Sequence, residues 1–273
     1  MKNILNKIKI NSFTYYFLIT CFICGLIKNA IILFLIVIIH EIGHLIMIRL
    51  CHYKIENVSI YPFGGITTIN KLINSNLNKD LIISLNGVIF QNIVMFLITT
   101  VFSLNENTVE IINYYNKSIT IFNILPIIPL DGSKILENIL NRLFPYKFSY
   151  YLTIVLSFLS IAIFFEYNKI HSLNNYLIIS VLIFYSIKYL KDLKYTFNKF
   201  LLERIMYTLP FKKINNNTKK LNDLKINNKH YFKFHDKYIS EEEKIRKKFD
   251  KSTYFWYDFN VWKGFLFKPH LTG

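Results

Sequence analysis

The sequence predicts an all-α polytopic membrane protein with about six transmembrane helices, a short hairpin and a small cytosolic C-terminal tail. Of its 273 residues, 52% are hydrophobic and only 18% are charged, and the mean hydropathy is +0.29. The apolar residues come in runs long enough to cross a bilayer, which is typical of membrane proteins rather than soluble domains. Most lysines and arginines lie in connections between these runs that would face the same side of the membrane.

Apolar segments of sufficient length are the candidate spans, since each crossing needs about 20 apolar residues. A tight connection at Lys28 and Asn29 joins the first two. The fourth is the least apolar and contains Pro126 and Pro129. We expect the spans at residues 12–28, 29–51, 81–104, 109–130, 148–166 and 172–190.

The distribution of basic residues predicts the orientation. These residues precede the first span, lie between the second and third and between the fourth and fifth spans, and follow the sixth. Both termini should therefore be cytoplasmic. The same topology places the C-terminal half of the second span and the sequence "PLDG" (residues 129–132) at the cytoplasmic face.

The C-terminal part of the chain is strongly basic. From Lys188 onward, 20 Lys and Arg stand against 9 Asp and Glu. Next to a membrane, such a tail suggests contact with anionic lipid headgroups or an acidic partner, and no motif supports binding to nucleic acid. Within the tail, the composition of residues 212–229 predicts a flexible linker, and "EEEKIRKK" (residues 241–248) predicts a solvated helix.

The second span carries a candidate metal site. His40 and His44 are four residues apart, so they lie on one face of a helix and can bind one ion. Glu41 would stand beside them and accept a proton from the attacking water. Ionisable residues inside a span need a functional reason. Two imidazoles, together with one carboxylate ligand from elsewhere in the chain, fit one zinc ion per chain.

A catalytic zinc needs a third protein ligand. The candidates are Asp131, Glu137, Asp80, Glu166 and His52. We favour Asp131, at the cytoplasmic end of the fourth span, although an Asp-Gly-Ser turn or a helix cap would explain it equally simply. Pro126 and Pro129 interrupt backbone hydrogen bonding there, which membranes tolerate only where backbone is buried in protein or lines a wet cavity. Asn123 could then hydrogen-bond a substrate backbone.

The segment after the second span is predicted to form a short hairpin. Residues 58–61 and 66–69 flank a turn that contains Phe63, Gly64 and Gly65. An extended substrate could add to the edge of this hairpin as another strand. A hairpin that only caps the helical bundle fits the same pattern.

Together, these residues resemble the site-2 protease family of intramembrane zinc metalloproteases, peptidase family M50. That family shows H-E-x-x-H on one helix and N-x-x-P-x-x-P-L-D-G on another, and both motifs are complete here at residues 40–44 and 123–132. The resemblance covers about residues 28 to 145. It implies that His40, His44 and Asp131 hold zinc and that Glu41 is the general base. One departure is Gly87, which is followed by valine where the family often has proline.

The resemblance is strongest to a subgroup that functions in sporulation. It implies a protease that releases a sigma factor from its precursor in the membrane around the forespore, with a membrane-associated substrate and inhibitory membrane proteins as partners. The chain then divides into an N-terminal cytosolic segment with the first span (1–28), a catalytic membrane core (29–147), the fifth and sixth spans (148–190) and the basic, aromatic-rich cytosolic tail (191–273).

Three other functions are compatible with parts of the pattern. A metal transporter could use the same polar residues, but the chain shows no internal repeat and a transporter has no need of Glu41 as a base. An inactive membrane scaffold would have no reason to keep both motifs intact. A housekeeping protease of the same family, which cleaves a membrane-anchored regulator, differs from the sporulation protease only in its substrate.

Overall fold

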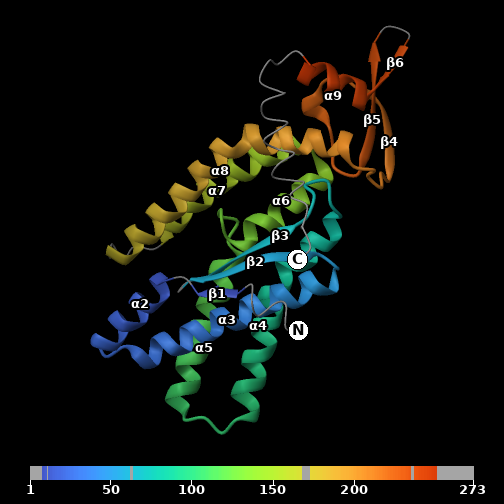
Figure 1. Cartoon of the computed structure of the whole chain (residues 1–273). Coiled ribbons are helices and arrows are strands. Elements are labelled where there is room, and N and C mark those ends of the chain that lie inside the picture. The colour runs from blue at the N-terminus through green and yellow to red at the C-terminus, as the bar shows by residue number, and fades with distance from the viewer. Residues whose placement is uncertain (1–7, 11, 62–63, 168–172, 235–236, 251–273) are drawn as a thin grey trace, which may run out of the picture.

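The computed structural model describes residues 8–10, 12–61, 64–167, 173–234 and 237–250. They form a helical bundle with one small sheet beside its central helices and a second small sheet at the end of its longest helix (Figure 1). In chain order the elements are β1 (Ile8–Ile10), α2 (Ser12–Ile23), α3 (Ile27–Leu50), β2 (Lys54–Tyr61), β3 (Gly64–Asn70), α4 (Leu77–Val101), α5 (Glu106–Ile124), α6 (Asp131–Leu143), α7 (Tyr146–Tyr167), α8 (Leu173–Met206), β4 (Lys213–Thr218), η1 (Leu221–Asp223), β5 (Asn228–Phe234), β6 (Lys237–Ser240) and α9 (Glu241–Asp250).

Helices occur at all the predicted spans, and three of them, α3, α4 and α7, are long and apolar enough to cross a membrane. Helix α2 has only 12 residues, and α5 contains Glu, Asn and Lys side chains. Helix α8 continues well beyond the predicted end of the sixth span, as far as Met206. The membrane character of the chain is therefore supported by three helices, and the total of six spans stays a prediction.

Close packing of α3 against α4 forms the centre of the bundle. A Cβ atom on Gly43 would lie 2.8 Å from Cβ of Phe90 and 2.9 Å from the carbonyl oxygen of Asn86, so only glycine permits this approach. The Asn86 side chain donates a hydrogen bond to the Gly43 carbonyl at 2.6 Å. Ile36 and Met95 are buried where α3, α4 and α5 meet. The helix that carries the H-E-x-x-H motif is thus fixed between two neighbours.

The first sheet confirms the predicted hairpin and adds a strand to it. Strands β2 and β3 are antiparallel, with Val58 opposite Thr67, and both are longer than the sequence indicated. Strand β1 pairs with β2 in parallel, with Ile8 opposite Val58. This pairing is absent from the sequence prediction, because three residues give no strand signal of their own. Since β1 covers the outer edge of β2, β3 is the strand of the hairpin that keeps a free edge among the described strands, and β1 forms the other edge of the sheet.

The predicted fourth span is too long at its C-terminal end. Helix α5 ends at Ile124, and a loop that contains Pro126 and Pro129 connects it to α6. The loop is packed inside the protein, where the backbone N–H of Ile128 donates to Oγ of Ser157 on α7 at 3.0 Å. The irregular backbone around Pro126 and Pro129 is therefore buried in protein, which is one of the two arrangements expected from the sequence for prolines within the membrane.

The tail contains a folded unit where the sequence predicted a flexible linker, so that prediction is wrong. Strand β4 pairs in parallel with β5, and β5 pairs with β6 in antiparallel orientation. We call β4, η1, β5, β6 and α9 the C-terminal unit. Its core is small but completely buried: Leu224, Phe232 and Ile245 pack with Phe200 and Leu201 of α8. A few apolar side chains are enough because α8 supplies the other half of the core.

The predicted solvated helix is confirmed on one face of α9. Exposed ion pairs join Glu242 to Arg246 at 2.9 Å and Glu243 to Lys247 at 2.6 Å. The opposite face buries Ile245 and packs against α8 and β5. Helix α9 therefore belongs to the core of the C-terminal unit rather than to a free tail.

Candidate metal centre

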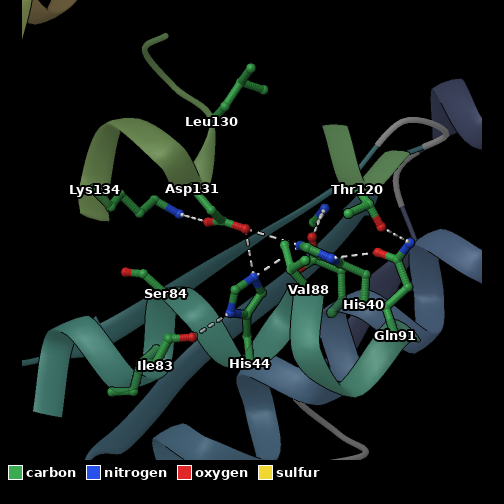
Figure 2. A network of polar contacts seen from close by, with 12 residues as sticks. His40, His44, Ile83, Ser84, Val88, Gln91, Thr120, Leu130, Asp131 and Lys134 are labelled. Carbon is green, nitrogen blue, oxygen red and sulfur yellow. Dashed lines mark hydrogen bonds and ion pairs between the residues drawn. The ribbon is translucent and has the colours of Figure 1, made fainter. Parts of the chain in front are cut away.

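His40 and His44 project from the same face of α3, one turn apart, and both are buried. Their Nε2 atoms lie 3.1 Å from each other. On the other side of each ring, Nδ1 of His40 is 2.9 Å from Oε1 of Gln91 and Nδ1 of His44 is 2.8 Å from the carbonyl oxygen of Ile83 (Figure 2). Because both partners accept hydrogen bonds, each Nδ1 carries the proton and each Nε2 presents a lone pair.

Asp131 reaches the same point from the first residue of α6. Its Oδ2 atom lies 3.0 Å from Nε2 of His40 and 2.8 Å from Nε2 of His44, and its Oδ1 atom is 2.8 Å from Nζ of Lys134. The Lys134 ammonium group compensates the negative charge of the buried Asp131 carboxylate. The N-terminus of α6 also favours a negative charge there. Asp131 is thus a carboxylate ready to bind a cation.

The three facing atoms fit a zinc ion. They lie 2.8 to 3.1 Å apart, whereas ligands about 2.0–2.2 Å from a tetrahedral zinc would be separated by roughly 3.3 Å. A small outward adjustment of each side chain is therefore sufficient. Two nitrogen donors and one carboxylate oxygen also match a catalytic zinc site, which keeps its fourth position open. Within the described ranges, no other three His, Cys, Asp or Glu side chains gather in this way.

Glu41 lies next to this cluster and is held by the first sheet. Its Oε1 atom accepts a hydrogen bond from the backbone N–H of Gly65 at 2.8 Å. A Cβ atom on Gly65 would lie 2.8 Å from the Glu41 carboxylate, so glycine is needed at this position. Since the Gly65 N–H points towards Glu41, the free edge of β3 faces the glutamate.

Gly87 explains how α4 can pass so close to the two histidines. A Cβ atom there would lie 2.3 Å from Nε2 of His44 and 2.9 Å from Cε1 of His40. The absent side chain leaves the space that the two imidazole rings occupy. The departure from a Gly-Pro pair at this position leaves this glycine in place.

Gln91 is a site residue that sequence reasoning missed. It is completely buried on α4. Its Oε1 atom accepts from His40, and its Nε2 atom donates to Oδ1 of Asn116 at 2.8 Å and lies 3.3 Å from Oγ1 of Thr120 on α5 (Figure 2). The only signal in the sequence was a glutamine in the middle of an apolar run. Its role depends on the packing of α4 against α3, which the sequence does not reveal.

Replacing Gln91 by leucine should weaken zinc binding about 10- to 100-fold, because the Nδ1 proton of His40 loses its acceptor and the ring loses its fixed orientation. The affinity can be measured on the full chain in detergent by competition with a chelator. Asn92→Leu is the matched control, since Asn92 bonds to Val88, Thr120 and Asn116 and not to His40. Equal zinc affinity in the Gln91→Leu and wild-type proteins would show that His40 needs no such support.

The other predicted site residues are placed as follows. Asn123 lies half-buried in the last turn of α5, and Pro126 and Pro129 lie in the loop that leads to Asp131. Gly64 begins β3, and a Cβ atom on it would lie 4.0 Å from Oε1 of Glu41. Phe63 lies outside the described residues. The roles of these residues in substrate binding stay predictions.

Two of the alternative third ligands have partners elsewhere. Asp80 forms an ion pair with Lys71 at 3.0 Å, and Glu137 accepts a hydrogen bond from the Tyr189 hydroxyl at 2.8 Å. Neither belongs to the cluster around the histidines, and the same is true of the two further candidates, Glu166 and His52. The structure therefore brings Asp131, and no other described acidic side chain, to both imidazole rings.

A helix that carries H-E-x-x-H inside a membrane-type bundle, with a carboxylate from a second helix completing the cluster, is typical of metal-dependent peptidases. Comparison of the sequence with known protein families gives the same class. The profile of peptidase family M50 matches residues 28–109 and 100–165. The chain belongs to peptidase family M50.

Similar individual proteins match about half of the chain. Stage IV sporulation protein FB of Bacillus subtilis (strain 168) is 29% identical over 144 residues, which are 52% of this chain and 50% of that protein. A zinc metalloprotease of Methanocaldococcus jannaschii is 29% identical over 122 residues, 42% of this chain and 35% of that protein. The chain thus spans half or less of the length of these relatives. Among solved structures, the site-2 protease of Methanocaldococcus jannaschii aligns with a TM-score of 0.49 and 23% identity, over 68% of this chain and 89% of that one.

Proposed function

We propose that this chain is an intramembrane zinc endopeptidase that hydrolyses a peptide bond of a membrane-associated protein near the cytosolic face. The observation that carries the proposal is the position of Glu41, which lies next to a buried cluster of His40, His44 and Asp131 and is held by a strand with a free edge. Membership of peptidase family M50 supports the class of reaction.

The protein residues divide the work of amide hydrolysis between them. When bound by His40, His44 and Asp131, a zinc ion would supply Lewis acidity, which polarises a carbonyl group and lowers the pKa of a water molecule. Glu41 would accept one proton of the attacking water on its free carboxylate oxygen and return it to the nitrogen of the leaving amine. The hydrogen bond from Gly65 keeps the carboxylate in position through both transfers.

The substrate would bind in an extended conformation along β3. A helical peptide bond is shielded by its own hydrogen bonds, so it must unwind before attack. Pairing with β3 would stabilise the unwound peptide, and the edge of β2 is already covered by β1. Gly64, the first residue of β3, would then lie beside the peptide, and the predicted role of Phe63 in substrate binding belongs to the same proposal. Asn123 would supply a further hydrogen bond to its backbone, and the loop at Pro126 and Pro129 would shape the space beside Asp131.

The proposed substrate is the precursor of a sporulation sigma factor. The support comes from a relative that is named as a sporulation protein. In this proposal both termini are cytoplasmic, inhibitory membrane proteins hold the enzyme inactive, and the site lies in the membrane that surrounds the forespore. The distribution of lysine and arginine supports the orientation.

Co-expression in a heterologous host tests the reaction and the substrate together. The full chain is expressed with the sigma-factor precursor of the same organism, either as wild type or as His44→Ala, and the precursor length is read by immunoblot. Wild type should shorten the precursor and His44→Ala should not, because one imidazole ligand is lost. Cys24→Ala, a change on an exposed side chain that is not part of the cluster, is the control and should behave as wild type.

The remaining outcomes separate the two parts of the proposal. If neither protein cleaves, while purified wild type holds about one zinc that His44→Ala lacks, the metal site stands and the sigma-factor substrate is excluded. Equal cleavage by both proteins would contradict a metal-dependent mechanism.

A further inference from the structure

Three lysines from three different helices gather where the C-terminal unit meets the bundle. Nζ of Lys147 on α7 lies 5.3 Å from the centre of the Phe197 ring, and Nζ of Lys248 on α9 lies 5.2 Å from the centre of the same ring. Lys194 precedes Phe197 by three residues on α8, so it lies on the same side of that helix. We call Lys147, Lys194 and Lys248 the lysine cluster.

The positive charges of the lysine cluster repel one another. Burial lowers the pKa of Lys248, and the positive charges of Lys147 and Lys194 lower it further. The hydrogen bonds of the cluster go to neutral amides: Lys248 donates to Oδ1 of Asn198 at 3.1 Å and Lys147 to Oδ1 of Asn222 at 3.4 Å. Among the described residues, none of the three ammonium groups has a carboxylate within 4.0 Å. An anion bound here would relieve the repulsion.

The lysine cluster differs from the solvated outer face of the same helix, α9, where each cation has an acidic partner. On its outer face, Arg246 and Lys247 each pair with a glutamate one turn earlier. Lys248 has Lys244 at that spacing instead. Both lysines lie over aromatic rings of the inner face, with Lys244 3.9 Å from the centre of the Phe232 ring. Lys244 and Lys248 thus share a face of α9 that carries neither Glu242 nor Glu243.

The position of the cluster favours a ligand at the membrane surface. Lys147 is the second residue of α7, whose candidate span runs from Tyr146 to Glu166. A rigid base supports the cluster: the Tyr146 ring stacks on Phe200 with centres 4.4 Å apart, and the Tyr146 N–H donates to the carbonyl of Leu224 in the C-terminal unit at 2.9 Å. Figure 1 shows α9 beside the end of α8, next to the start of α7. The cluster therefore lies at the level where a span leaves the hydrocarbon.

We propose that Lys147, Lys194 and Lys248 form a binding site for the phosphate group of an anionic phospholipid, which holds the C-terminal unit against the membrane surface. Basic residues at the cytoplasmic end of a span are suited to such headgroups. Three ammonium groups around one phosphate would replace mutual repulsion by attraction. The site is separate from the metal centre and does not depend on the proposed reaction.

The test measures binding of phosphatidylglycerol to the full chain in mixed detergent micelles, by displacement of a fluorescent phosphatidylglycerol. Lys147→Gln, Lys194→Gln and Lys248→Gln are combined in one variant, and Lys212→Gln, Lys213→Gln and Lys233→Gln in a control with the same change of charge. The first variant should bind roughly 100-fold more weakly than wild type. The control should bind as wild type, and phosphatidylcholine should not compete.

The following results would overturn the proposal. Equal affinity of wild type and the cluster variant, or equal competition by phosphatidylcholine, would exclude a phosphate site for anionic lipid. Inorganic phosphate that binds the cluster as tightly as phosphatidylglycerol would assign it to a free anion. If the glutamine variant does not fold, Lys147→Arg, Lys194→Arg and Lys248→Arg replace it. They keep the charges and should keep the affinity, and loss of binding there would contradict a charge-based site.

Discussion

Replacing Glu41 by glutamine is expected to lower the rate of peptide hydrolysis about 100- to 10,000-fold, the usual contribution of a positioned general base. Glutamine has nearly the same shape, and its carbonyl oxygen can accept the hydrogen bond from Gly65 that Glu41 accepts now. It cannot take a proton from water. The histidine and aspartate side chains of the cluster are unchanged, so zinc content should stay at the wild-type level. Single-turnover cleavage and metal analysis of the same preparation give both quantities.

Glu56→Gln is the matched control for this prediction. Glu56 is exposed on β2 and belongs to the same sheet that holds Glu41. The control should cleave at the wild-type rate. Retention of more than a tenth of the activity by Glu41→Gln would show that another group accepts the proton. Loss of zinc together with activity would mean that Glu41 supports metal binding rather than proton transfer.

The local part of the site could be predicted because helix geometry is fixed. Residues four apart on a helix share a face, so the spacing of His40 and His44 was sufficient to place both Nε2 atoms together. Asp131 is 87 residues away from His44 along the chain. Only the motif around it, and two prolines at membrane depth, suggested where it would lie. The sequence predicted which residues would meet, and the structure supplies how α6 begins at Asp131.

Contacts that depend on helix packing could not be predicted. Gln91 and Asn92 are adjacent and equally polar, yet only Gln91 faces His40. The choice is made by the rotation of α4, which the close approaches at Gly43 and Gly87 determine. Strand β1 was missed for a similar reason, since three residues acquire a strand conformation only because β2 is beside them.

Composition was misleading in the tail. An Asn- and Lys-rich segment has too few apolar residues to fold alone, which led to the prediction of a linker at residues 212–229. The segment folds because Leu224 and Ile226 pack on Phe200 and Leu201 of the long helix α8. The core is thus shared between two parts of the chain that are far apart in sequence.

Arg204 is the centre of a buried polar network that joins this unit to the rest of the protein. Its Nη2 atom lies 2.8 Å from Oε2 of Glu241, and neither side chain is more than 6% exposed. Its Nη1 atom donates to Oδ1 of Asn74 at 3.1 Å, in the connection between β3 and α4. Glu203 accepts from the backbone and side-chain amide of Asn74 at 3.0 and 3.1 Å. The end of α8 therefore ties α9 to the loop that follows the first sheet.

The charge of Arg204 also acts on His230 in β5. Burial lowers the pKa of His230 to about 4, and the Arg204 charge contributes to the shift. The ring is thus neutral at physiological pH, where it hydrogen-bonds with Oγ1 of Thr218 at 2.7 Å and accepts from the backbone N–H of Lys225 at 3.0 Å. Arg204, Glu241 and His230 form one connected set of buried groups.

Arg204→Ala should destabilise the C-terminal unit by about 3–5 kcal/mol, because it leaves the Glu241 carboxylate buried without its partner. Hydrogen exchange of the β5 amides, measured on the full chain in detergent, should then be more than about 100-fold faster, while exchange in α3 stays unchanged. Arg246→Ala removes an exposed ion pair of the same type and should cost no more than about 1 kcal/mol. Similar exchange rates in the two variants would show that the network around Arg204 does not hold the unit in place. A rise in exchange that extends to α3 would instead show that the C-terminal unit and the metal-binding bundle unfold together.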